Sequence, residues 1–156
     1  MGNKIIEFDS IGGVCDRLRN EGKKIVMCNG SFDILHAGHI KFLTEAKGQG
    51  DVLVVGLNSD SSIKKYKSED RPINKEGDRA FVLAALFVVD YVVVFSDVNP
   101  IKLLEVVKPS VFVNGVEYGE DCVESEVVKK FGGRVHLVEN YKGLSSTKII
   151  EGMKKE

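Results

Sequence analysis

Two histidines, His36 and His39, stand three residues apart with Gly38 between them. An apolar run at residues 25–28 precedes them and a helical pattern at 40–47 follows, which predicts a strand, a turn and a helix. Backbone N–H groups at such a turn and at a helix start form a site for phosphate. Two imidazoles at this spacing can face one anion and donate hydrogen bonds to it, and Gly38 lets the backbone approach closely.

The histidine pair has two other interpretations. Both residues could be ordinary polar side chains at a helix start, or they could bind zinc. A zinc site needs further ligands, but the third histidine, His136, lies in an apolar strand-like run and the chain has no Cys-x-x-Cys. We therefore predict a phosphate site and no metal bound by protein side chains. No Ser-His-Asp or Cys-His pattern indicates a covalent nucleophile.

The stretch 29–39 resembles the His-x-Gly-His signature of the nucleotidyltransferase superfamily, which is cytidylyltransferase-like. Its members join a nucleotide to a phosphorylated small molecule and release pyrophosphate. From about residue 24 to 150 the chain is most similar to the bacterial D-glycero-D-manno-heptose 1-phosphate adenylyltransferases, the nucleotidyltransferase domain of the ADP-heptose synthase. The run Arg-Pro-Ile-Asn at 71–74 resembles the heptose branch in particular. In that family the domain is often fused to a sugar kinase, which we do not expect here.

The resemblance implies an enzyme that transfers AMP from ATP to heptose 1-phosphate, with Mg²⁺ accompanying the nucleotide. CTP or GTP could replace ATP. The alternatives are a glycerol-3-phosphate or other alcohol-phosphate cytidylyltransferase, and a catalytically inactive nucleotide-binding sensor. The glycerol-phosphate enzymes carry an arginine where this chain has Phe87, which we expect in the core, and this difference favours the sugar phosphate. A homodimer is also expected from the family.

The same resemblance implies the residues of the site. The catalytic candidates are His36, His39, Lys67 and Arg79. The nucleotide-binding candidates are Gly30, Ser31, Phe32, Asp33, Gly38, Asn114, Glu117, Ser145, Ser146 and Thr147.

Several of these candidates also have a simpler interpretation. Residues 145–147 would hold β- and γ-phosphates at a helix N-terminus, although a plain N-cap has the same sequence. Lys67 belongs to a charged run that could simply be solvated. Arg79 begins a predicted helix, where a cation is disfavoured unless it meets an anion, so a ligand contact is favoured over a surface salt bridge. Asp33 would orient the turn or approach the metal, and Asn114, where the family often has lysine, could belong to a simple turn.

Alternating strands and helices must position these residues. We expect strands at 24–28, 51–57, 91–95, 110–113 and 134–138. We expect helices at 14–19, from about 40 to 48, at 78–86, 100–107 and 120–131, and from 145 onward, with a charged loop at 64–74. This order predicts an α/β fold: one Rossmann-like domain over 1–156, with a lead-in to residue 23 and a core at 24–150. Its five-stranded parallel sheet would carry helices on both faces and the site at the carboxyl ends of its strands.

Composition limits the partners. The formal net charge of −1 implies no general surface for nucleic acid, so a phosphate site must be local. No apolar run approaches the roughly 20 residues of a membrane span, and the N-terminus lacks a signal-peptide layout. Three widely spaced cysteines, an odd number, favour the reducing cytoplasm over a disulfide framework.

Overall fold

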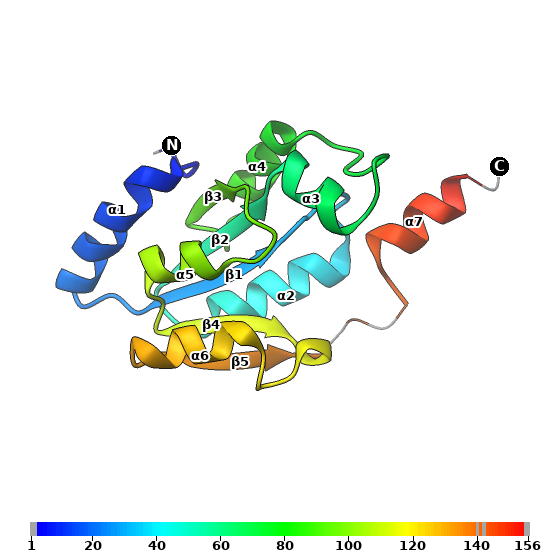
Figure 1. Ribbon diagram of the computed structural model, residues 1–156. Helices are drawn as coiled ribbons and strands as arrows, with labels where there is room; N and C mark the ends of the chain where they lie inside the picture. Colours follow the sequence, from blue (N-terminus) through cyan, green and yellow to red (C-terminus); the bar gives the residue numbers. More distant parts are fainter. Residues whose placement is uncertain (1–2, 140, 142, 155–156) are drawn as a thin grey trace.

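A single all-parallel sheet organises the chain. The computed structural model describes residues 3–139, 141 and 143–154. The strand order is β3-β2-β1-β4-β5 (Figure 1). The strands are β1 (Ile25–Gly30), β2 (Val52–Asn58), β3 (Tyr91–Phe95), β4 (Val111–Gly115) and β5 (Arg134–Val138). The predicted five-stranded parallel sheet is confirmed, with β3 and β5 at the predicted bounds.

Helices cover both faces of this sheet, as predicted. They are α1 (Phe8–Asn20), α2 (Ala37–Lys47), α3 (Asp60–Tyr66), α4 (Glu76–Ala85), α5 (Ile101–Val107), α6 (Val123–Lys130) and α7 (Ser146–Met153). Successive side chains of a strand point to opposite faces, so β1 supplies two cores. Ile25 and Met27 pack with buried residues of α1, α5 and α6. Val26 and Cys28 pack with buried residues of α2 and α4 on the other face.

The first helix is longer than predicted. We expected a short helix at 14–19 with Gly12 and Gly13 interrupting the lead-in, but both glycines lie inside α1. The helix forms because Ile11, Cys15 and Leu18 share one buried face. A Cβ added to Gly12 would lie 3.3 Å from Val106, so a side chain there would crowd the packing of α1 against α5.

Two other segments differ from expectation. The predicted loop at 64–74 begins inside α3, whose N-cap Ser59 accepts a hydrogen bond from the Ser62 N–H. The helix predicted at 120–131 is confined to α6, and the 3₁₀ helix η1 (Val116–Tyr118) precedes it. Gly119, with φ of 71°, ends η1 in a conformation that disfavours other residues.

The position of Phe87 also differs from expectation. We placed it in the core, but its side chain is 96% exposed just after α4. The position at which this chain has phenylalanine and the glycerol-phosphate enzymes have arginine therefore lies on the surface. The described cysteines, Cys15, Cys28 and Cys122, are free thiols. Within the residues that the structure describes, every helix is too short or too polar to cross a membrane.

The strand order also creates a place for a ligand. β1 lies between β2 and β4, so the chain builds the sheet first to one side of β1 and then to the other. At such a reversal the connections after neighbouring strands diverge and leave a crevice at their carboxyl ends. The turn after β1 and η1 after β4 flank this crevice. Figure 1 shows α3 and α7 at the same end of the sheet.

Candidate functional site

The turn after β1 has an unusual backbone. Phe32 adopts φ of 42°, a left-handed conformation that costs free energy for a residue with a side chain. Its ring is buried, and its centroid lies 5.4 Å from that of His39. Because such a conformation persists only when its surroundings hold it, the contacts around the turn decide the shape of the site.

Asp33 ties this turn to the loop after α3. Its carboxylate accepts hydrogen bonds from Arg71 Nε and from the N–H groups of Ile73 and Asn74, each at 2.9 Å. The Asn74 side chain donates back to the Asp33 carbonyl at 2.6 Å. Burial alone would raise the pKa of Asp33, but the Asn74 and Ile73 N–H groups and Arg71 outweigh it and hold the pKa below its ordinary value. These donors occupy the carboxylate, so in this structure Asp33 orients the turn.

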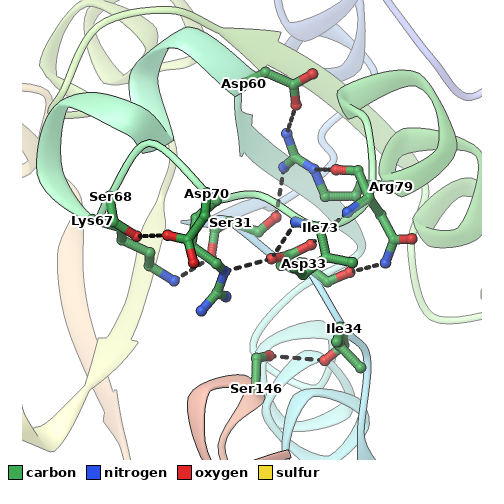
Figure 2. A network of polar contacts seen from close by, with 12 residues as sticks. Ser31, Asp33, Ile34, Asp60, Lys67, Ser68, Asp70, Ile73, Arg79 and Ser146 are labelled. Carbon is green, nitrogen blue, oxygen red and sulfur yellow. Dashed lines mark hydrogen bonds and ion pairs between the residues drawn. The ribbon is translucent and has the colours of Figure 1, made fainter. Parts of the chain in front are cut away.

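Arg79 lies beneath the turn rather than in the cleft. Its guanidinium donates to the carbonyls of Ser31 at 2.6 Å, Asn58 at 2.9 Å and Asn74 at 3.0 Å. It also donates to the Asp60 carboxylate at 2.8 Å, and its side chain is 1% exposed (Figure 2). We predicted a ligand contact, but the structure shows a buried clamp that joins the ends of β1 and β2 to the start of α3. The anion expected at this cation is Asp60.

The histidine pair stands where β1 gives way to α2. His36 is the N-cap of α2, and its Nδ1 accepts a hydrogen bond from the Gly38 N–H at 3.1 Å. His39 Nδ1 accepts from the His36 N–H at 3.4 Å. Because each Nδ1 is an acceptor, the proton of each neutral ring lies on Nε2, which can donate to a ligand. The two rings are stacked, with centroids 3.9 Å apart.

Gly38 is required for this arrangement. A Cβ at this position would lie 2.9 Å from two atoms of the His36 ring and 3.3 Å from the Tyr141 side chain. These separations are too short for a side chain, so Gly38 allows the His36 ring to fold back over the helix start.

Both imidazoles are neutral at pH 7. Burial lowers the pKa of His39 to about 4, and the neighbouring His36 and Lys67 charges add to the effect. Burial also lowers the pKa of His36. Each neutral ring keeps its Nε2–H, so both rings can donate a hydrogen bond to a phosphate oxygen at physiological pH.

This low pKa predicts a dependence of stability on pH. The native state keeps His39 neutral down to about pH 4, whereas the unfolded chain takes up a proton near the ordinary value of 6.5. The unfolded state therefore binds more protons between these values, and the free energy of unfolding should fall as the pH falls through that window. Urea unfolding from pH 4 to 7 should show a shallower decline for His39→Asn than for the wild type. Parallel curves would contradict the shifted pKa.

The start of α7 closes one side of the site. Ser145 caps this helix by accepting the Lys148 N–H at 3.1 Å, so the plain N-cap interpretation holds for that residue. Ser146 Oγ donates to the Ile34 carbonyl at 2.9 Å and so anchors α7 to the turn (Figure 2). Thr147 lines the cleft beside them. The start of α7 lines the same cleft as the histidine pair, and a helix N-terminus favours an anion, so capping does not exclude phosphate binding.

These elements enclose a cleft of about 860 Å³. Of the predicted site residues, only Asp33 and Arg79 do not line it. The predicted residues that do are Gly30, Ser31, Phe32, His36, Gly38, His39, Lys67, Asn114, Glu117, Ser145, Ser146 and Thr147. The carboxyl-terminal edge of a parallel sheet thus brings together segments more than a hundred residues apart.

The cleft also contains residues that the sequence analysis missed. They include Asn29, Tyr66, Asn99, Glu124, Glu139 and Tyr141. Tyr66 lies at the end of α3, inside the segment 64–74 whose charged residues predict a loop. The Lys41 Nζ lies 4.1 Å from the Tyr141 ring centroid, a cation–π contact that sequence spacing does not reveal.

The described carboxylates are among the side chains that could supply ligands to a metal ion. Among residues 3–139, 141 and 143–154, no group of three or more His, Cys, Asp or Glu side chains is placed to hold a metal ion. Asp33, the residue considered for metal contact, already binds Arg71 and two backbone N–H groups.

Sequence comparisons agree on one class of protein. A family model described as cytidylyltransferase-like matches residues 27–152. The bifunctional protein HldE of Geobacter metallireducens is 48% identical over 149 residues, which cover 95% of this chain and 30% of that protein. The HldE protein of Aliarcobacter butzleri is 48% identical, covering 92% of this chain and 30% of that protein. The chain thus spans about a third of the length of these curated relatives.

Solved structures give a matching result. The lipopolysaccharide core biosynthesis protein of Thermoplasma volcanium has a TM-score of 0.62 and 35% identity, covering 78% of this chain and 98% of that one. Pantoate-beta-alanine ligase of Francisella tularensis has a TM-score of 0.66 at 18% identity, covering 96% of this chain and 76% of that one. The second likeness concerns the fold alone.

Proposed function

Because the chain belongs to the cytidylyltransferase-like family, we propose that it transfers AMP from ATP to heptose 1-phosphate and releases pyrophosphate. The sequence predicts a nucleotidyltransferase, and membership of this family confirms that prediction. The single observation that carries the proposal is the cleft in which the stacked His36 and His39 rings meet the start of α7.

In the proposed reaction the acceptor phosphate attacks the α-phosphorus of the nucleotide, and pyrophosphate leaves from the opposite side. The protein must hold two anions together and stabilise charge on the transferred and leaving groups. The Nε2–H groups of His36 and His39 would donate to oxygens of the nucleotide phosphates. The N–H groups at the start of α7 would receive the β- and γ-phosphates.

Relatives support a sugar phosphate as the acceptor. The HldE proteins match nearly the whole chain, and the Thermoplasma volcanium protein is named for lipopolysaccharide core biosynthesis. The heptose-like run at 71–74 supports the site from outside the cleft, because Arg71, Ile73 and Asn74 bind Asp33, which orients the turn. The presence of Phe87 in place of an arginine no longer supports a sugar phosphate over glycerol phosphate, because the Phe87 side chain is exposed and does not line the cleft.

Mg²⁺ would enter with the nucleotide. The described carboxylates do not form a magnesium site by themselves, and Mg²⁺ commonly binds through substrate phosphates with few protein ligands. When bound, the ion would neutralise phosphate charge. A homodimer in the cytoplasm remains part of the proposal on the family resemblance alone.

Pyrophosphate release with defined substrate pairs tests the proposed acceptor. We expect kcat/KM for heptose 1-phosphate with ATP to exceed that for glycerol 3-phosphate with CTP by about tenfold or more, which corresponds to ~1.4 kcal/mol of transition-state stabilisation. The physical reason is that a heptose offers several hydroxyls for polar contacts in the large cleft, whereas glycerol offers few.

Swapped pairs, heptose 1-phosphate with CTP and glycerol 3-phosphate with ATP, separate the choice of base from the choice of acceptor. A higher kcat/KM for glycerol 3-phosphate would favour an alcohol-phosphate cytidylyltransferase. Nucleotide binding without turnover on any sugar or alcohol phosphate would favour the inactive sensor.

A further inference from the structure

Arg71 carries a guanidinium nitrogen without an acceptor. Its Nε donates to Asp33, and its side chain is 9% exposed. Its Nη2 is buried and has no hydrogen-bond partner among the residues that the structure describes. A buried donor without a partner costs about 1–3 kcal/mol, and more when it is charged. Since buried polar groups are bonded as a rule, this nitrogen indicates an acceptor that comes from outside the chain.

A second cation is anchored to the same turn. Lys67 lines the cleft, and its Nζ donates to Ser31 Oγ at 3.1 Å, two residues before the Asp33 that binds Arg71. Burial lowers the pKa of Lys67, and the Arg71 charge lowers it further, so the two cations lie within electrostatic reach. The Asp33 carboxylate that binds Arg71 is already shared with two backbone N–H groups. A further anion would relieve the repulsion between the two cations.

The position of this pair indicates which anion binds. Lys67 and Ser146 approach the turn from different sides (Figure 2). Ser146 belongs to the helix start proposed to hold the departing phosphates of the nucleotide. In phosphoryl transfer the attacking and leaving oxygens lie roughly in line, on opposite sides of the phosphorus. With the departing phosphates at the start of α7, the cations on the Lys67 side would be left for the attacking group.

We propose that Arg71 Nη2 and Lys67 Nζ bind the phosphate of the acceptor, a sugar 1-phosphate. This assignment rests on the proposed nucleotidyl transfer and adds Arg71 to its substrate-binding residues. It also gives the guanidinium two tasks, because Nε holds the turn through Asp33 while Nη2 receives the substrate. A planar guanidinium suits both, since its donors point in fixed directions.

The structure shows this subsite closed. Nη2 is covered, so a phosphate must displace the groups above it. The adjoining segment 67–70 is exposed, and Asp70 is linked by exposed hydrogen bonds to Ser68 at 2.6 Å and to Lys154, just after α7, at 3.3 Å. Exposed bonds of this kind open at low cost, so the segment can move aside when the acceptor arrives.

Steady-state kinetics with heptose 1-phosphate and ATP, in which KM is measured for each substrate, test the assignment. Arg71→Gln should raise KM for heptose 1-phosphate about 10- to 100-fold, the loss of one charge-assisted hydrogen bond, and leave KM for ATP within about threefold. Arg71→Lys keeps the charge and should show a smaller rise. Lys67→Gln should act in the same direction. The exposed Lys65 on α3 is the matched control, and Lys65→Gln should change neither KM.

A purely structural role would give a different pattern. If Arg71 acts only by holding Asp33, then Arg71→Gln and Arg71→Lys should raise both KM values together, as Asp33→Asn would, and that result would overturn the proposal. Absence of wild-type turnover with heptose 1-phosphate would count against the proposed function instead. In that case, calorimetric titration with inorganic phosphate tests the anion subsite on its own. Weaker phosphate binding by Arg71→Lys than by the wild type would support the subsite. Equal binding by the two proteins would reject it.

Discussion

His39→Ala should fold and lose about 10²–10³-fold in turnover, the usual effect of removing one donor that stabilises developing charge. His39 presents Nε2–H to the cleft because its Nδ1 accepts the His36 N–H. Its low pKa keeps the ring neutral, so the donor is present across the physiological range. The measurement is kcat for pyrophosphate release with saturating ATP and heptose 1-phosphate, together with a circular dichroism spectrum to verify folding.

His136→Ala is the matched control for this variant. His136 lies on β5, outside the cleft, where its Nε2 is 2.9 Å from Glu45 Oε1. Its removal should leave turnover within about twofold, since it touches no proposed substrate group; effects of that size are below ~0.5 kcal/mol. Near wild-type turnover in His39→Ala would show that the histidine pair only caps α2.

Arg79→Met should reduce the free energy of unfolding by about 3–5 kcal/mol, the range for breaking a buried ion pair by removing one partner. Methionine fills a similar space but donates no hydrogen bonds. The carbonyls of Ser31, Asn58 and Asn74 and the Asp60 carboxylate would all lose a donor. Urea unfolding at pH 7 measures the change.

Lys102→Met provides the comparison. Lys102 pairs with Asp97 at 2.8 Å, but the two side chains are 70% and 40% exposed, so solvent screens the pair. The expected loss is therefore much smaller than that of Arg79→Met. If Arg79→Met were as mild as Lys102→Met, the guanidinium would not be the clamp that holds the turn. A ligand contact would then become the better explanation of Arg79.

The order of strands and helices could be predicted from the sequence because apolar runs and glycine turns are local signals. Residues 91–95 and 134–138 were predicted as strands and form β3 and β5 at those bounds. The chain order of parallel strands also places their carboxyl ends at one edge. For this reason His36, Asn114 and Ser145 were predicted to converge, and they line one cleft.

Local signals failed where a contact came from a distant segment. Gly12 resembled a helix interruption, yet the packing of α1 against the core holds it in a helix. Phe87 resembled a core residue because it is hydrophobic, but it follows the end of α4 and its side chain is exposed. Hydrophobicity alone does not show in which direction such a side chain points.

The roles of the charged residues were decided by tertiary structure alone. Arg79 was expected to meet a ligand, but Asp60 and three carbonyls from separate segments take its hydrogen bonds. Arg71 stood in the sequence as part of a family-like run, and only the fold places its Nε on Asp33 and leaves its Nη2 without a partner among the described residues. Sequence shows which residues can carry charge and donate hydrogen bonds. Whether those donors are used by the protein or left for a substrate depends on which distant acceptors the fold brings within about 3 Å.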